Sequence, residues 1–206
     1  MTESFFIDRP SFDPTSGEAR FAYRLNDLSF VEVLSLPKAV AADKSDTPAF
    51  RKLLDLTAFV LGVSYFKLRA PFDIVSDLPL TEAEQAFVID VYENGLGEFY
   101  ARNELARFGR LKLQVPADPT ARQPSIDLPQ RTLLPIGGGK DSLVSVELLS
   151  HVGVDFSPFA VNPKGPILTS VDAIGRAPVY VSRTLDPEMI RLGKEPGFYN
   201  GHVPST

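Results

Sequence analysis

The sequence contains no cysteine, so the chain can form no disulfide, no thiolate metal site and no cysteine-based catalytic centre of its own. Long apolar runs are also absent. The longest, around residues 56–63, is far too short to span a bilayer. The first ten residues carry acidic side chains early and lack a basic segment followed by an apolar run, so no signal peptide is predicted. These absences predict a soluble protein of the cytoplasm that does not bind membranes.

Basic residues are outnumbered as well. The chain has 26 acidic and 21 basic residues, a net charge of -5 and a pI near 5.1. A general nucleic-acid binder would show a basic face, so nucleic acid is not expected as a partner. What the chain does have is length and apolar content. Its 206 residues, 44% of them hydrophobic, can bury a real core, as one large domain or two small ones.

Residues 1–115 are predicted to form an α+β domain. Elements are expected from turn residues, alternation and helical spacing. They are two strands around a turn within residues 5–25, a strand over 29–36, a helix over 49–68, a second helix from Thr81 to about residue 105, and a strand over 111–115. Thr81 and Glu84 form a capping-box pattern at the start of that second helix. This region has no catalytic constellation, and its acids and arginines are interpreted as a solvated surface.

Residues 116–130 hold four prolines and few large apolar side chains, so they are predicted to be a linker. Beyond the linker, in residues 131–206, strands and helices alternate. Strands are expected at 132–136, 157–161 and 178–182, and helices at 140–152 and 167–174. This alternation predicts a parallel sheet with crossover helices. Pro135 lacks a backbone donor and is therefore placed at the carboxyl end of its strand.

Three consecutive glycines lie between the first of these strands and its helix, in "GGGKDS", Gly137–Ser142. Open α/β sheets bind ligands at this position. The first turn of a helix has unpaired N–H groups and a partial positive charge, and glycines let the backbone approach phosphate oxygens closely. Lys140 could add charge and Ser142 a hydroxyl donor. Asp141 could cap the helix, anchor the loop or hold a magnesium ion. The alternative is a glycine turn with a helix cap and no ligand.

Two familiar phosphate loops do not fit the segment. A Walker loop has the pattern Gly, four residues, Gly-Lys and then Ser or Thr. Here Asp141 follows Lys140, and no glycine stands at the required earlier position. A dinucleotide fingerprint requires Gly-x-Gly-x-x-Gly, and its third glycine would fall at Ser142.

The segment resembles the PP-loop of the ATP pyrophosphatase superfamily, whose pattern is Ser-Gly-Gly-x-Asp-Ser after a first strand. "GGGKDS" differs only at its first position, where Gly137 replaces serine. The resemblance implies a PP-loop fold and an ATP site that binds the nucleotide through Gly137, Gly138, Gly139, Lys140, Asp141 and Ser142, with Mg²⁺ at Asp141. Members cleave ATP to AMP and pyrophosphate and usually adenylate an oxygen of the substrate. Asn162, after the second strand, would meet the adenosine, or it forms an ordinary Asn-Pro turn.

The glycine segment, the opening residues 5–25 and the terminal "GFYNGHVP" (residues 197–204) together resemble the bacterial UDP-N-acetylmuramoyl-L-alanyl-L-glutamate epimerase family. That family makes the D-glutamate of peptidoglycan on the nucleotide-linked dipeptide, so the resemblance implies a UDP-muramoyl dipeptide as substrate. Its members are considerably longer, which identifies this chain as an amino-terminal portion with an incomplete sheet. The isolated portion is therefore expected to be inactive.

The remaining polar candidates lie near the carboxyl end. Asn200, Gly201 and His202 become substrate-binding candidates through the resemblance, and His202 a catalytic one, although a turn histidine is more often a solvated bystander. His151 is interpreted as a favourable charge at a helix end. Two other functions stay open. The chain could belong to another adenylating PP-loop enzyme, an amide ligase or an RNA-modifying enzyme, or it could be a non-catalytic nucleotide-binding fragment.

Overall fold

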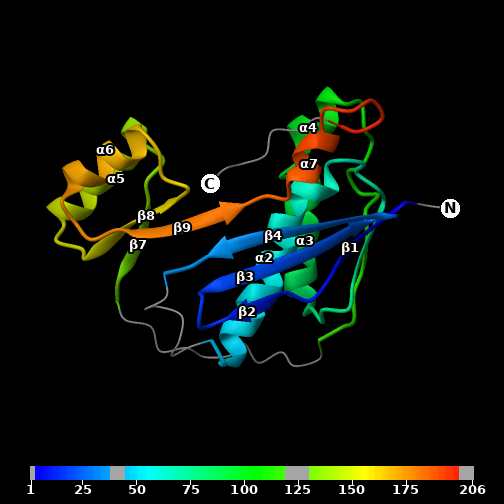
Figure 1. Ribbon diagram of the computed structural model, residues 1–206, viewed down its shortest axis with the longest axis horizontal. Helices are drawn as coiled ribbons and strands as arrows, with labels where there is room; N and C mark the ends of the chain where they lie inside the picture. The colour runs from blue at the N-terminus through cyan, green and yellow to red at the C-terminus, as the bar shows by residue number, and fades with distance from the viewer. Residues whose placement is uncertain (1–2, 38–44, 119–129, 200–206) are drawn as a thin grey trace.

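The computed structural model describes residues 3–37, 45–118 and 130–199, and these form a mixed α/β fold around one nine-stranded sheet (Figure 1). The strands are β1 Ser4–Ile7, β2 Ser11–Asp13, β3 Glu18–Leu25, β4 Leu28–Ser35, β5 Asp73–Ser76, β6 Lys112–Gln114, β7 Thr132–Pro135, β8 Phe156–Val161 and β9 Val179–Thr184. Their order across the sheet is β6-β5-β1-β3-β4-β9-β8-β7, and β2 pairs with β3 beside this path.

The amino-terminal strands alternate between buried and exposed side chains, which is typical of a sheet with one covered face. β3 pairs antiparallel with β1, β2 and β4. Between β2 and β3, the Asp13 carboxylate accepts hydrogen bonds from the Thr15 N–H and the Ser16 hydroxyl, and Gly17 has a φ of 78°. The predicted turn is confirmed, but the segment around it contains three strands, β1, β2 and β3, where two were expected.

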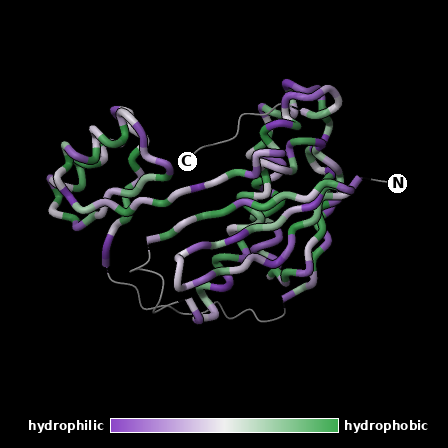
Figure 2. The backbone as a smooth tube through the Cα atoms, viewed as in Figure 1, coloured by the Kyte–Doolittle hydropathy of each residue, from purple (hydrophilic) through white to green (hydrophobic). Residues whose placement is uncertain are grey.

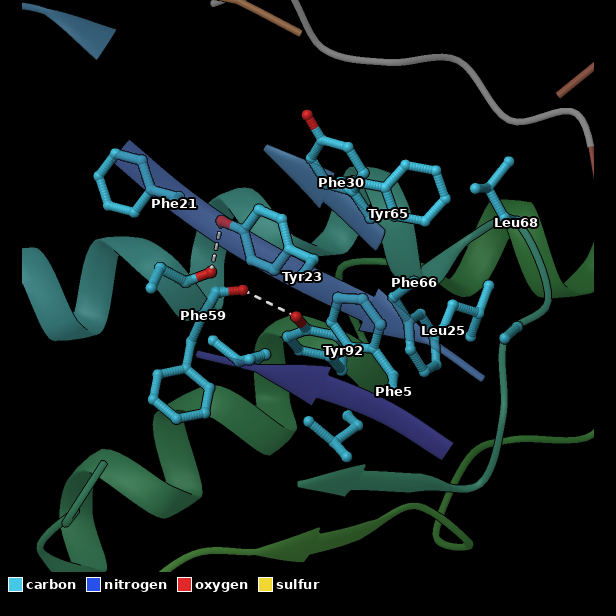
Figure 3. Close-up of a cluster of buried hydrophobic side chains, with 14 of the residues drawn as sticks. Phe5, Phe21, Tyr23, Leu25, Phe30, Phe59, Tyr65, Phe66, Leu68 and Tyr92 are labelled. Atoms are coloured by element: carbon cyan, nitrogen blue, oxygen red, sulfur yellow. Dashed lines mark hydrogen bonds between the residues drawn. The ribbon is translucent and has the colours of Figure 1, made fainter. Parts of the chain in front are cut away.

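Helices cover one face of these strands. They are α2 Pro48–Phe66, α3 Glu82–Glu93 and α4 Gly97–Arg102, and α7 Pro187–Leu192 packs into the same core. Figure 3 shows how aromatic side chains fill this core. The hydroxyl of Tyr23 donates to the Ala58 carbonyl at 3.0 Å and that of Tyr92 to the Phe59 carbonyl at 2.8 Å, so both rings are buried without losing a hydrogen bond.

The predicted long helix after Thr81 is wrong in its length. Its capping box is present, with Thr81 N–H donating to Glu84 at 2.8 Å and Glu84 N–H to the Thr81 hydroxyl at 3.3 Å. The helix nevertheless ends at Glu93, and α4 begins after a break at residues 94–96. Asn94 and Gly95 are poor helix formers, and both of their N–H groups bond the Asp90 carbonyl.

The alternation predicted for the last part of the chain is confirmed. β7, β8 and β9 pair in parallel, connected by α5 Lys140–His151 and α6 Pro166–Ile174. Both helices lie on the same side of these strands in Figure 1. Pro135 is the last residue of β7, as expected for a residue without a backbone donor. A small second core of four buried residues lies under the helices, composed of Ile136, Val146, Phe156 and Val171.

The two parts of the chain share this sheet, because β4 pairs antiparallel with β9 at Leu34↔Arg183. α7, which follows β9, contributes Met189 and Leu192 to the core of the amino-terminal strands. The predicted division at residues 116–130 stays a prediction, since most of that segment lies outside the described residues. Figure 2 shows that the strands on both sides of this junction carry hydrophobic segments.

Candidate functional site

The glycine loop continues directly from β7 at the carboxyl edge of the parallel strands. Ile136 N–H donates to the Phe159 carbonyl at 2.8 Å, so the sheet extends one residue past β7. The chain then turns through the three glycines into α5, with Gly139 as its N-cap at φ -96° and ψ 166°. Among the described residues no side chain caps this helix. The first-turn N–H groups therefore remain available to a ligand or water.

Gly138 is the residue that shapes the loop. Its φ of 76° lies in the left-handed region, where side chains cause strain. A Cβ atom there would lie 3.0 Å from the Ile167 nitrogen and 3.1 Å from the Pro166 carbonyl carbon, both backbone atoms at the start of α6. Glycine is thus required for the close packing of the loop on α6, independently of any ligand.

Gly137 and Gly139 have the opposite surroundings. A Cβ added to either would meet no atom within 4 Å in the described part of the chain. Open space therefore lies beside the backbone at the positive end of the α5 dipole, where an anion is favoured. The arrangement fits a phosphate group, and larger side chains at these two positions would occupy the space such a group needs.

The polar residues of the loop differ in whether their side chains already make a hydrogen bond. The Ser142 hydroxyl donates to the Gly139 carbonyl at 2.8 Å, so it must rotate before it can donate to a phosphate. Lys140 and Asp141 are exposed. Within the described residues no group of three or more acidic or histidine side chains could hold a metal ion. Magnesium at Asp141 would therefore need phosphate oxygens and waters as its other ligands, as is common for this ion.

Asn162 lies at the carboxyl end of β8, beside the loop, with a φ of 47°. Its side-chain amide donates to the Arg183 carbonyl at 2.8 Å and accepts from the Arg183 N–H at 2.9 Å. This pair of bonds continues the β8–β9 ladder through a side chain. The amide is occupied in holding β9, and an adenosine contact by Asn162 stays a prediction.

Arg183, which Asn162 holds, also belongs to a buried polar cluster where β9 pairs with β4. Its guanidinium donates to both carboxylate oxygens of Glu32, at 2.6 and 3.3 Å, and to the Ser64 hydroxyl at 3.1 Å. Glu32 is fully buried. Burial raises the pKa of Glu32, against the opposing effect of Arg183. No buried side-chain nitrogen or oxygen among the described residues lacks a hydrogen bond, so the cluster is satisfied.

Lys67 is buried at the end of α2, and its pKa is lowered by burial and by the positive charge of Arg183. The interpretation of the amino-terminal acids and arginines as a solvated surface is wrong for the buried acids Glu32 and Glu93. The sequence did contain a signal for Glu32. It stands two residues after the buried Phe30, so alternation along the strand places both on the same face.

Of the two histidines in the chain, His151 lies in the described residues and His202 does not. His151 is the last residue of α5 and is exposed, which agrees with its interpretation as a helix-end residue. Asn200, Gly201 and His202 lie outside the described residues. No helix in the described ranges is both long enough and apolar enough to cross a membrane.

The fold and the loop define a mixed α/β domain with a candidate anion site at the carboxyl edge of its parallel strands. The profile described as MurL N-terminal domain matches residues 1–206, and the chain belongs to this family. The resemblance to the epimerase family is thereby confirmed, whereas the PP-loop fold stays a prediction. No solved structure shows significant similarity to the chain.

Three curated relatives, each named UDP-N-acetyl-alpha-D-muramoyl-L-alanyl-L-glutamate epimerase, match nearly the whole chain. The Micromonospora protein is 39% identical over 212 residues, which cover 99% of this chain and 47% of the relative. The Xanthomonas oryzae protein is 35% identical (98% and 46%), and the Salinispora tropica protein is 36% identical (99% and 46%). The chain thus spans a little less than half the length of these relatives.

Proposed function

We propose that this chain is the nucleotide-binding, amino-terminal part of an epimerase that inverts the terminal L-glutamate of UDP-N-acetylmuramoyl-L-alanyl-L-glutamate in peptidoglycan precursor synthesis. The observation that carries the proposal is the identity of 35–39%, along nearly the whole chain, to relatives named for that substrate. The open glycine loop at the carboxyl edge of the sheet supports ATP as a second substrate, since the loop fits a phosphate group.

The chemistry explains why such an enzyme would consume ATP. The Cα–H of glutamate beside a free carboxylate is a very weak acid, because its removal places a second negative charge next to the first. When the carboxylate oxygen attacks the α-phosphorus of ATP, pyrophosphate leaves and a mixed anhydride forms. Its carbonyl can accept the charge of the carbanion. A base then removes the Cα proton, an acid returns one on the opposite face, and water releases AMP.

The residues of this chain would hold the nucleotide. The backbone at Gly137 and Gly139 and the first turn of α5 would bind phosphate oxygens, with the Lys140 charge beside them. Asp141 would contribute one ligand to a magnesium ion carried by the phosphates. Gly138 would keep the loop seated on α6. The acid and base are not assigned, because in the described residues the loop carries no histidine and no pair of carboxylates.

The role of the loop in binding phosphate is tested by measuring ATP affinity with calorimetry. Gly139→Val should abolish measurable binding and leave the fold intact, because the backbone there is extended and the side chain would enter open space. Gly97→Val is the matched control, since Gly97 also has open space around it but lies at the start of α4. Unchanged ATP affinity in folded Gly139→Val protein would contradict the phosphate role.

The reaction is tested in a hybrid protein, in which this chain replaces the matching portion of the Micromonospora relative. With ATP and magnesium, the hybrid should form the D-glutamate product, AMP and pyrophosphate, and in deuterated water the product should carry deuterium at the glutamate Cα. The unaltered relative is the positive control. AMP formation without Cα exchange would keep the adenylating site and exclude the epimerase, and ADP formation would indicate a different kind of site.

The 206-residue chain alone should bind ATP but not invert the substrate, since the relatives have more than half of their length outside the matched region. This is measured with the same deuterium assay at high protein concentration. Sustained turnover by the isolated chain would show that this region contains the complete active centre.

A further inference from the structure

The outer face of α5 exposes apolar side chains that a solvated helix would not. Of the thirteen large hydrophobic residues exposed in the described part of the chain, seven lie between residues 133 and 168. Four of these form the α5 face, which we define as Leu143, Val144, Leu148 and Val152, with exposed fractions of 38–67%. Figure 2 shows hydrophobic and hydrophilic segments alternating along this helix and α6. A helix that is apolar on more than one side is normally covered on more than one side.

The inner side of α5 contributes little to the core by comparison. Val146 is its buried residue, and the core beneath α5 and α6 has four buried residues against twenty-three in the core of the amino-terminal strands. Val144, Leu148 and Val152 follow one another at intervals of four, so they form one stripe along the helix. Beside them lies a shallow groove of about 580 Å³, lined by Lys140, Leu143, Val144, Glu147, Leu148 and His151.

The charges around the groove argue against a membrane or a nucleic acid. Lys140 and Glu147 offset each other, and an interfacial helix would carry several basic residues on its polar side. A second copy of the chain is also a poor fit. α5 has 12 residues, about 18 Å in length and 10 Å in width, whereas a stable interface buries about 800 Å² on each partner.

We propose that the α5 face binds the polypeptide that the longer relatives carry beyond this amino-terminal region. Each relative has 53–54% of its length outside the match, since the matches cover 47% and 46% of their chains. Because that polypeptide is covalently attached, its contact with α5 is intramolecular, and an effective concentration in the millimolar range makes a small apolar patch sufficient. The contact would cover the helix that begins at the glycine loop. This inference does not depend on the proposed reaction.

The absence of cysteine from the chain permits a clean footprinting experiment. Leu148→Cys places a thiol on the α5 face, where Leu148 is 62% exposed, and Leu53→Cys is the matched control, a leucine of α2 that is 57% exposed. Maleimide labelling is followed by peptide mass spectrometry in the 206-residue chain and in the hybrid with the Micromonospora continuation. Leu148→Cys should label at least tenfold more slowly in the hybrid, and Leu53→Cys equally fast in both proteins.

Several results would overturn the proposal. Equal labelling of Leu148→Cys in both proteins would show that the face stays open. Protection in the 206-residue chain that grows with protein concentration would indicate a second copy, and protection by phosphatidylglycerol vesicles would indicate a membrane. If circular dichroism shows that the hybrid is unfolded, the continuation is added as a separate polypeptide to wild-type and Leu148→Lys chains. Binding should then be lost with Leu148→Lys, and binding of equal strength to both would contradict the proposal.

Discussion

At the scale of single residues, the three loop glycines have different reasons to be glycine. Gly138 combines a φ of 76° with backbone atoms of α6 at 3.0 and 3.1 Å from any added Cβ. Gly137 and Gly139 are free of both constraints in the described structure. Gly138 therefore serves the fold, and Gly137 and Gly139 leave room for a ligand.

Substitution by alanine separates these roles. Gly138→Ala should reduce the free energy of unfolding by about 1–3 kcal/mol, because the side chain would be strained in φ and would press on the α6 backbone. Gly137→Ala should change it by less than about 0.5 kcal/mol. Both are measured by urea denaturation without nucleotide. Equal effects of the two substitutions would show that the loop does not pack on α6 as described.

The sequence predicted the loop, but not the hydrogen bonds that the polar residues in and near it make within the fold. Spacing alone placed the glycines between β7 and α5, because a strand, a turn and a helix start each have local signals. It could not reveal that the Ser142 hydroxyl already donates to Gly139 or that the Asn162 amide holds Arg183. Those bonds depend on which strands become neighbours, and that is a property of the tertiary fold.

At the scale of elements, α3 shows how one residue can serve two contacts. Glu84 accepts the Thr81 N–H of the capping box and also pairs with Lys52 of α2 at 2.7 Å. Burial alone would raise the pKa of Glu84, but Lys52 and the Thr81 backbone outweigh it, and the pKa lies below its ordinary value of 4.5. A carboxyl with a lowered pKa stabilises the fold above its unfolded pKa and loses this contribution as the pH falls.

Glu84→Gln should therefore be less stable than wild type at pH 7, because the amide cannot pair ionically with Lys52. The difference should shrink as the pH falls below about 4.5, the unfolded pKa, toward the lower folded value. Thermal denaturation between pH 3 and pH 7 measures it. Glu82→Gln, at an exposed residue of the same helical turn, is the matched control substitution. A constant difference at all pH values would refute the ionic contribution.

Most elements could be predicted locally, and the failures have physical causes. Helices α2, α5 and α6 and the strands β4, β7, β8 and β9 have clear periodicity or flanking turn residues. β5 and α7 were missed because each is short, four and six residues, and depends on its neighbours for burial. The break between α3 and α4 was missed because the apolar pattern continues across Asn94 and Gly95 while the helical hydrogen bonds do not.

At the scale of the whole molecule, one ion pair links two neighbouring strands of the sheet that are far apart in the sequence. Glu32 of β4 and Arg183 of β9 are almost completely buried, with side-chain exposures of 0% and 8%. Replacing one member leaves the other charged in a site with little water. The pair is thus a requirement of the junction, whatever its net contribution to stability.

Arg183→Met should reduce the free energy of unfolding by about 3–5 kcal/mol, and the double substitution Arg183→Met with Glu32→Leu should recover a large part of that loss. Arg176→Met is the control, since Arg176 pairs with Asp155 at the surface and such pairs contribute about 0–1 kcal/mol. Guanidinium denaturation measures all three. A loss below about 1 kcal/mol for Arg183→Met would mean that water reaches the junction and solvates Glu32.

The pairing of β4 with β9 also determines the order in which a newly made chain can be completed. Glu32 and Arg183 are 151 positions apart. Translation proceeds at about 5–20 residues per second, so β9 is synthesised about 8–30 seconds after β4. During that time one edge of β4 is open to pairing with other nascent chains. A buried-facing glutamate in the middle of that strand disfavours such pairing until its arginine arrives. The charge that must be paired in the finished junction is therefore the same one that disfavours wrong pairing of the unfinished strand.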